Sequence, residues 1–544
     1  MKKIIYIYLL IAVFFSACAD FLEERPQNFE DANETLSTTR GFQAFLNGLH
    51  SYQRDEFQTW GGDQVIVTQT ATPYEILIGG TDVAAVSTRD NTLPIFETYT
   101  FNASTGLISN RWRWAYGLIA NANMMYDAAD NESVNWDTAT DKDYFKANAA
   151  FFRAYAYRYL VYLYGDVPLV LHVQAQYRTD FERTPKTEVI NQMVDDLELA
   201  AKYLPEDPSK VEDGQLTKWA ALHLLSEISL LAGNNERAKT AALEVINSGH
   251  YQLMENRFGT QRDRNGDVFS DLFKDKNFNR EGGNLESIWV IQAEYQTNGG
   301  GNRYTDWTRR AFVPGYYNVN GFMISVEYGG RGLGQVIPTD WWLGLYENDD
   351  IRNSEYNIRR TWIYNNPNVP ELYGKVYGQA NERPNAEEME NFLKSNRKAG
   401  NIFPTTTKFE FGIENDPTYE GNDKDKYRMR LAETYLLLAE ACINLGELDN
   451  AADAVNAVRA RANTTLVSPS EVNIDYLLDE RARELFGEEF RRFTLVRTGK
   501  LVERTKKYNP ESANHIKDHN VLWPIPQNVI DSNTGNKWSN NPGY

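Results

Sequence analysis

The chain has 544 residues and a formal net charge of −19 at pH 7, from 75 acidic and 56 basic residues. Nucleic-acid phosphates and anionic membrane faces both attract basic surfaces, so this charge argues against both as partners. Aromatic residues make up 13% of the chain, with 32 Tyr and 12 Trp. Rings beyond those needed for a core suit the flat faces of sugars and the side chains of peptides alike.

The N-terminal residues have the pattern of an export signal. Met1-Lys2-Lys3 precedes an unbroken apolar run from Ile4 to Phe15, and Ser16-Ala17 precedes Cys18. A basic start, a short apolar core and small residues before a cleavage point are typical of a secretory signal. The run is shorter than the ~20 residues that a transmembrane helix needs. We therefore predict that residues 1–17 are removed and that Cys18 is lipidated, which anchors residues 18–544 to a membrane.

Helical periodicity dominates two blocks, at about 37–250 and 428–505. Apolar positions at 3- and 4-residue steps, with glycine and proline at the ends, predict individual helices. The expected helices are 147–164, 185–204, 216–231 and 236–248 in the first block, and 428–445 and 449–461 in the second. Cys442, the only other cysteine, lies in such a pattern and is expected to be a small buried residue.

The last pair of helices in each block repeats at an offset of 213 residues. Matching positions include Leu224 with Leu437, Gly233 with Gly446, and Ala238 with Ala451. This is the pattern of a tetratricopeptide-like helical hairpin, and such hairpins bury their faces only by stacking. The predicted fold class is therefore mostly α: a tetratricopeptide-like scaffold with large irregular loops and a few short strands, such as 287–292.

Between the blocks, about 251–427, periodicity fades and Gly, Asn, Asp, Tyr and Trp become frequent; residues 54–110 are similar. Loops on a rigid scaffold are where binding residues usually lie.

Several landmarks then occur in order along the chain. They are Cys18-Ala19-Asp20-Phe21-Leu22, Arg111-Trp112 to Asn123, Phe151-Phe152-Arg153-Ala154-Tyr155, Tyr164-Gly165-Asp166-Val167-Pro168, Arg430 to Ala462, Glu480 to Arg497, Trp523-Pro524-Ile525-Pro526, and Asn541-Pro542-Gly543-Tyr544. Over essentially the whole mature chain, this series resembles the SusD/RagB family of outer-membrane lipoproteins. The chain departs from the family pattern near Phe493-Thr494 and at Asn540, positions that look structural.

The resemblance implies a single SusD-like domain over 18–544, lipid-anchored in the outer leaflet of the outer membrane and exposed on the cell surface. It implies a protein that binds a nutrient, caps a SusC-like TonB-dependent transporter and delivers the ligand for import. The ligand is expected to be an oligosaccharide. Two alternatives stay open: a RagB-type cap that binds peptides, and a transporter lid without a ligand of its own.

The sequence carries no local motif for an enzyme, such as G-x-S-x-G, H-E-x-x-H or a P-loop. His515 and His519 have helical spacing but no third ligand, so a metal site is not expected there. Asp263, Asn265 and Asp267 begin like a calcium loop, but Val268 and Lys274 break the EF-hand pattern. We predict a polar turn there and no cofactor, with a structural calcium ion as the alternative.

A sugar site needs exposed aromatic rings beside short polar side chains in loops. Two loop-rich stretches offer this combination. The predicted ligand residues are Trp60, Asp63, Asp82, Arg89 and Asn91 in the first stretch, and Tyr304, Asp306, Trp307 and Tyr316 in the second. Trp112, Trp114, Trp341 and Trp342 are assigned to the core instead.

Overall fold

The computed structural model describes residues 35–57, 73–89, 92–174, 176–297, 299–300, 306–379 and 382–544. Within these ranges helices dominate and the strands are short, which confirms the mostly α fold class. The helices are α3 (Thr39–Arg54), α4 (Pro73–Leu77), α5 (Pro94–Glu97), α6 (Gly106–Ala128), α7 (Asp141–Tyr164), α8 (Lys186–Tyr203), α9 (Lys218–Leu231), α10 (Asn235–Ile246), α11 (Val268–Asp271), α12 (Thr308–Phe312), α13 (Asp340–Leu343), α14 (Ala386–Lys398), α15 (Leu431–Leu445), α16 (Leu448–Arg461), α17 (Ile474–Leu485), α18 (Arg491–Arg497), α19 (Leu501–Tyr508) and α20 (Gln527–Ser532). The strands are β1 (Ala84–Val86), β2 (Ser287–Ile291), β3 (Val336–Pro338), β4 (Ile358–Arg359), β5 (Thr405–Thr406) and β6 (Lys426–Arg430).

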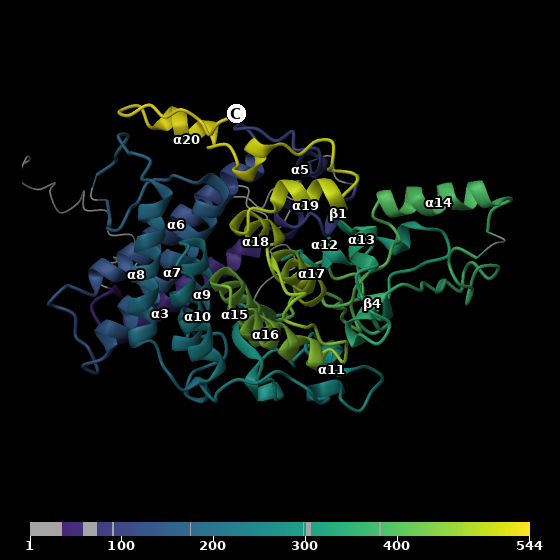
Figure 1. Cartoon of the computed structure of the whole chain (residues 1–544), viewed down its shortest axis with the longest axis horizontal. Helices are drawn as coiled ribbons and strands as arrows, with labels where there is room; N and C mark the ends of the chain where they lie inside the picture. Colours follow the sequence, from purple (N-terminus) through teal and green to yellow (C-terminus); the bar gives the residue numbers. More distant parts are fainter. Residues whose placement is uncertain are drawn as a thin grey trace, which may run out of the picture.

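The long helices form a stack in which each packs against the next, in the order α6, α7, α8, α9, α10, α15 and α16. Figure 1 shows this stack on the left and in the centre of the molecule, with α14 projecting at the right-hand end. Because α15 follows α10 in space, the stack joins two blocks that lie far apart in the sequence. The helical scaffold is therefore built from both predicted blocks.

The two repeated hairpins, α9–α10 and α15–α16, contact each other through α10 and α15. Ala238 and Ala451, the matched alanines, are both fully buried, which lets the helices of each hairpin approach closely. Ser226 stands where the tetratricopeptide pattern prefers glycine, and its hydroxyl donates to the Ala238 carbonyl at 2.9 Å. The hydrogen bond satisfies the buried hydroxyl, so the seam tolerates serine.

The helix starts predicted at 147 and 428 are wrong, and the start predicted at 185 is off by one residue. The first of these helices, α7, begins earlier than predicted, at Asp141. Residues 426–430 form β6, which pairs antiparallel with β2, so the helix starts at Leu431 and not at 428. Arg430 pairs with Ser287 in this ladder, and Arg428 lies at an irregularity in its register. The apolar periodicity of the following helix does not reveal this strand. Pro185 is the residue that caps α8, one position before its first turn.

Buried ion pairs tie the C-terminal helices to the β2–β6 ladder. The Arg430 guanidinium binds Glu286 at 2.7 Å and Glu484 at 2.6 Å, with all three side chains at most 1% exposed. Arg352 binds Glu480 at 2.7 Å and also binds Glu484, so the carboxylates on α17 are shared between arginines. Such a network holds together only if every member has a partner. We infer that these residues maintain the fold.

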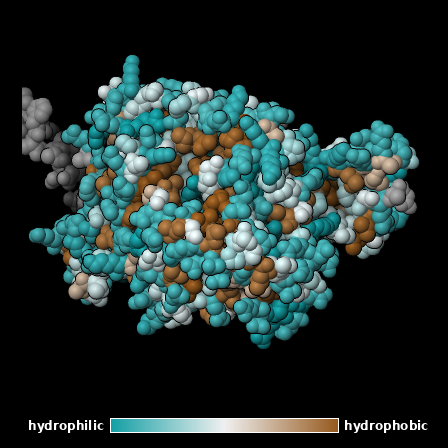
Figure 2. Space-filling view, viewed as in Figure 1, coloured by the Kyte–Doolittle hydropathy of each residue, from teal (hydrophilic) through white to brown (hydrophobic). Residues whose placement is uncertain are grey.

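The projecting part of the molecule, here termed the α14 lobe, comprises residues 315–331, 362–379 and 382–401. It packs over a small core of its own, formed by Val313, Tyr316, Val319, Phe322, Tyr328, Trp362, Tyr364 and Ile402. Figure 2 shows hydrophobic patches on this lobe, at the right of the view. Among its exposed apolar side chains are Met323 at 46% and Tyr373 at 56%. The lobe therefore offers a mixed polar and apolar surface outside the helical stack.

Glu97 gives the fold a testable pH dependence. It ends α5, is buried, and accepts the backbone N–H of Val86 in β1. Burial raises the pKa of Glu97 to about 7, against about 4.3 in an unfolded chain. The folded state therefore holds this proton more tightly, and the stability it contributes is lost as pH rises from about 4.3 through 7.

We expect the wild type to lose more stability than a Glu97→Gln variant when the pH is raised from 5 to 8. The difference in the free energy of unfolding, measured by urea denaturation, should be about 1–3 kcal/mol. Glutamine keeps the shape of the protonated side chain but does not ionise. Equal losses in the two proteins would contradict this role for Glu97.

Candidate ligand-binding site

Part of the predicted site falls outside the described residues. This applies to Trp60, Asp63, Asn91 and Tyr304, and also to the predicted signal segment and Cys18. The remaining predicted ligand residues, Asp82, Arg89, Asp306, Trp307 and Tyr316, can be placed.

Asp82 is a structural residue, contrary to the prediction. It is fully buried, and its carboxylate accepts from Arg491 at 2.9 and 2.7 Å and from Arg504 at 2.9 Å. Burial alone would raise its pKa, but the two guanidinium groups outweigh burial and hold the pKa of Asp82 below its usual value. A carboxylate engaged in this way has no oxygen to offer a ligand.

Three predicted ligand residues of the second stretch are also buried. Trp307 is 3% exposed, and the guanidinium of Arg310 lies 3.9 Å from its ring centroid. Tyr316 is fully buried and donates its hydroxyl to the Gly330 carbonyl at 2.9 Å. Asp306 is 8% exposed and pairs with Lys426. Their prediction as ligand contacts is corrected, because loop-rich composition alone does not separate exposed rings from core rings.

Arg89, from the first predicted stretch of ligand residues, contacts the second stretch, which follows Tyr304. Its guanidinium and the Asn318 side chain both lie close to Gly315: a Cβ on Gly315 would sit 2.6 Å from Arg89 Nη2 and 2.8 Å from Asn318 Nδ2. Its Nε donates to the Ala399 carbonyl at 3.3 Å, and its Nη2 donates to Asn401. A half-buried arginine therefore fastens the first stretch to the α14 lobe.

A group of charged and polar residues surrounds this junction: Arg89, Arg310, Tyr317, Arg331 and Glu420, here termed the arginine–tyrosine cluster. Glu420 pairs with Arg331 at 2.5 Å and with Arg310 at 3.4 Å, and Tyr317 donates to the Gly332 carbonyl at 3.0 Å. Burial lowers the pKa of Arg310; Glu420 opposes this, while Arg331 and Arg89 add to it. The Arg331 side chain is 35% exposed, so it is the member that a ligand can reach most readily.

Beside the cluster lies a pocket of about 260 Å³, here termed the asparagine pocket. Asn318 belongs to its wall, and the side chains of Asn318 and Arg89 both lie against Gly315, so the two features are adjacent. Its lining consists of Asn318, Val319, Asn320, Tyr364, Leu372, Glu382, Arg383, Phe392 and Asn396.

Hydrogen bonds and a ring contact fix the side chains that form the walls of the asparagine pocket. Tyr364 donates its hydroxyl to Glu382 at 2.8 Å, and Asn396 donates to the Phe392 carbonyl at 3.0 Å. The guanidinium of Arg383 stacks 3.5 Å from the centroid of Phe392. Asn320 is exposed at the rim. A preformed pocket that combines amide, guanidinium and carboxylate groups with aromatic surface suits a ligand with many hydroxyls and an apolar face.

The described ranges contain no group of three or more His, Cys, Asp or Glu side chains that could hold a metal ion. Asp267, the end of the calcium-like segment, instead caps α11 and accepts from the Ser270 N–H at 2.7 Å. In those same ranges no helix has the length and apolarity to cross a bilayer.

Comparison with proteins of known structure defines the class of fold. A laminarin-binding SusD-like protein matches 92% of this chain and 99% of its own, with a TM-score of 0.68 at 21% identity. A surface glycan-binding protein A from Bacteroides thetaiotaomicron, solved in complex with laminarihexaose, matches 93% and 99% with a TM-score of 0.68 at 18% identity. The fold is that of the SusD-like proteins.

Sequence comparison then gives the family. The model for the SusD family matches residues 285–544, and the model described as starch-binding associating with outer membrane matches residues 20–230. SusD-like protein P25 of Formosa agariphila is 24% identical over 97% of this chain and 96% of its own. SusD-like protein P2 of the same organism is 26% identical over the full length of both. The chain belongs to the SusD/RagB family.

Sequence reasoning missed Asn320, Glu382, Arg383 and Arg331. The segment 316–318 and its neighbours did carry the signal of mixed aromatic and amide residues, and it borders the pocket. Residues 364–396 have the same composition, with Tyr364, Asn381 and Asn396 among charged residues. They lie far along the chain from the predicted ligand residues 304–316.

Proposed function

We propose that this chain is a cell-surface glycan-binding lipoprotein that captures an oligosaccharide and delivers it to a SusC-like TonB-dependent transporter. The observation that carries the proposal is the asparagine pocket, with the arginine–tyrosine cluster beside it, on a SusD-like scaffold. Sugar hydroxyls pair well with amide, carboxylate and guanidinium groups, while Phe392 and Tyr364 supply flat apolar surface. Membership of a family described as starch-binding, and glycan-binding structural neighbours, support the ligand class.

Capture without turnover is the mechanism we propose. The asparagine pocket has room for only part of a long glycan, so affinity would come from several sugar units of one chain bound in adjacent subsites. No cofactor is required for binding of this kind. The peptide-binding cap is the second candidate, but extended peptides are usually recognised by backbone pairing along a strand edge.

Isothermal titration calorimetry with laminarihexaose, maltohexaose, cellohexaose and a mixed oligopeptide library tests the proposal. We expect binding to at least one hexasaccharide and no loss of its chain length after incubation. Binding to oligopeptides alone would favour the RagB-type alternative. No binding to any compound tested would favour a transporter lid without a ligand of its own. Shortening of the sugar would contradict all three readings.

The anchoring proposal rests on Cys18 and has its own test. The match to the N-terminal family model begins at residue 20, close behind that cysteine. We propose that residues 1–17 are a signal peptide and that lipid on Cys18 holds residues 18–544 in the outer leaflet, where the helical stack can face the transporter. The loop-rich residues 251–427 would then serve as the ligand-binding insertion between the two scaffold blocks, 37–250 and 428–505.

A Cys18→Ala variant should move from the membrane fraction to the soluble fraction, because the acyl chains supply the anchoring free energy. Immunoblots of separated fractions measure this, and circular dichroism should show an unchanged fold. The assay is best done in a strain without the transporter, since retention there would contradict lipid anchoring through Cys18.

A further inference from the structure

A second pocket lies away from the α14 lobe, between α6, the loop 168–181 and α20. Its volume is about 290 Å³, near the lower end of the ~300–1,000 Å³ typical of small-molecule sites. Figure 1 places α6 and α20 on the left of the molecule and α14 at the right-hand end. We term it the tryptophan pocket; its lining is Trp112, Tyr116, Pro168, Val170, Tyr177, Arg178, Phe181, Asn528, Val529, Ser532, Asn533 and Trp538.

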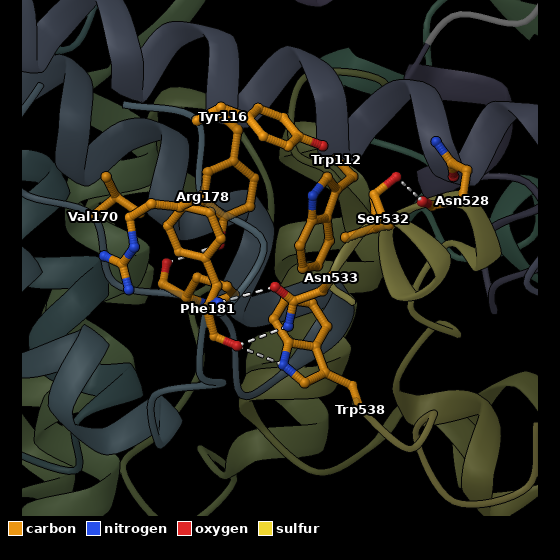
Figure 3. Close-up of a pocket in the computed structure, with 12 residues that line it drawn as sticks. Trp112, Tyr116, Val170, Arg178, Phe181, Asn528, Ser532, Asn533 and Trp538 are labelled. Atoms are coloured by element: carbon orange, nitrogen blue, oxygen red, sulfur yellow. Dashed lines mark hydrogen bonds between the residues drawn. The ribbon is translucent and has the colours of Figure 1, made fainter. Parts of the chain in front are cut away.

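Five of the twelve residues that line the tryptophan pocket are aromatic. Figure 3 shows Trp112 and Trp538 near the segment that carries Phe181 and Arg178, with Asn528 and Ser532 on the α20 side. The ring centroids of Trp112 and Trp538 are 6.5 Å apart, and the Arg178 guanidinium lies 4.8 Å from the Phe181 centroid. Tyr177 is 87% exposed, far more than any other large apolar or aromatic side chain among the exposed ones described. A ring so open to water at the edge of an aromatic pocket favours a contact with a bound molecule.

The wall opposite α6 is fixed by unusually many hydrogen bonds. Asn533 accepts from the Phe181 N–H at 2.9 Å and donates to the Phe181 carbonyl at 2.8 Å. The same carbonyl also accepts from the Trp538 indole at 2.8 Å and from Asn536 at 3.2 Å. These bonds hold the rings of Phe181 and Trp538 in place before any ligand arrives, which lowers the entropy cost of binding.

The same bonds indicate what kind of ligand fits. Both backbone groups of Phe181 are occupied, and the Thr179 carbonyl accepts from the Gly535 N–H at 2.7 Å. The backbone groups of Phe181 and the Thr179 carbonyl are therefore not free to pair with an extended peptide. What remains is flat aromatic surface with polar side chains, Arg178, Asn528 and Ser532, at the rim. A pyranose ring has this complementarity, with an apolar C–H face and hydroxyls around its edge.

We propose that the tryptophan pocket is a second carbohydrate-binding site, which takes one or a few sugar units of a glycan chain through stacking on aromatic rings. The proposal rests on the glycan-binding function proposed above, but on different residues. A second site at the other end of the molecule would let one protein hold two points of a long polysaccharide and so raise its avidity.

Native mass spectrometry with laminarihexaose and maltohexaose counts the sites directly. We expect two bound oligosaccharides for the wild type and one for Tyr177→Ala/Asn528→Ala, whose exposed side chains can be removed without opening the core. The loss of one stacked ring and one hydrogen bond should weaken this site by at least about tenfold. The Asn320→Ala/Arg383→Ala variant, altered in the asparagine pocket, should also retain one, bound at the tryptophan pocket.

Other outcomes separate the two proposals. One bound sugar in the wild type, unaffected by Tyr177→Ala/Asn528→Ala and lost in Asn320→Ala/Arg383→Ala, would overturn the second site and leave the proposed function standing. No bound sugar in any protein would overturn both. Two bound sugars in Tyr177→Ala/Asn528→Ala, together with weaker association with the transporter, would assign the pocket to protein docking and overturn the carbohydrate site.

Discussion

Replacing Asp82 by alanine should lower the free energy of unfolding by about 3–5 kcal/mol, the usual cost of removing one partner from a buried ion pair. Asp82 holds Arg491 on α18 and Arg504 on α19, and both guanidinium groups are at most 2% exposed. Without the carboxylate, two positive charges remain close together in the interior. Their other partners, Glu489 for Arg491 and Asp479 for Arg504, compensate only in part.

Chemical denaturation of purified protein, followed by far-UV circular dichroism, measures the effect. Asp340→Ala is a suitable control, because Asp340 forms an ion pair with Arg397 while its side chain is 85% exposed. A surface pair of that kind contributes about 1 kcal/mol or less. If Asp82→Ala unfolds at the same denaturant concentration as Asp340→Ala, then Asp82 does not hold α18 and α19 in place as the structure indicates.

Removing Asn320 and Arg383 together should weaken glycan binding at the asparagine pocket by at least about tenfold. Each side chain offers hydrogen bonds at the pocket wall, and such bonds contribute about 0.5–1.5 kcal/mol, or more where one group is charged. Neither residue is buried, so the variant should keep its fold. Calorimetric titration with the hexasaccharide that the wild type binds gives the change in affinity.

Lys394→Ala provides the matched control for this experiment. Lys394 lies on α14 in the same lobe, and its side chain is 72% exposed and pairs only with Glu390 among the described residues. It is absent from the pocket lining. We expect wild-type affinity for Lys394→Ala. Equal affinity in Asn320→Ala/Arg383→Ala and Lys394→Ala would show that the sugar binds elsewhere.

The helical scaffold follows from local patterns, and so it could be predicted. Observed helices such as α8 (Lys186–Tyr203) and α16 (Leu448–Arg461) begin and end within one residue of their predicted bounds. The repeat at an offset of 213 residues also fixed which hairpins resemble each other. For each single helix the information lies within a window of about 11–18 residues, where periodicity and turn residues act directly.

The site could not be predicted in the same way, because its parts meet only in the folded chain. Asp82 stands in a glycine-rich stretch that looks exposed, yet its partners Arg491 and Arg504 lie 409 and 422 residues away. The asparagine pocket draws on residues 318–320, 364, 372, 382, 383, 392 and 396, which are spread over separate parts of the chain. Composition located the loop-rich part of the chain that carries the site, but burial decided which of its residues face a ligand.

Several of the landmarks behind the family resemblance also acquire a physical meaning. The Glu480 to Arg497 segment supplies the buried carboxylates and guanidinium groups that join α17 and α18 to the rest of the fold. Near the C-terminus, Asn541 donates to the Tyr164 and Trp523 carbonyls at 3.0 and 2.7 Å. These residues hold the scaffold together from the inside.

A crystal structure of the protein with a bound hexasaccharide tests the central claim most directly. Our account predicts sugar rings in the asparagine pocket, hydrogen-bonded to Asn320 and Arg383 and extending toward Arg331. Well-defined sugar found only at other sites, with the asparagine pocket empty at saturating ligand, would contradict it.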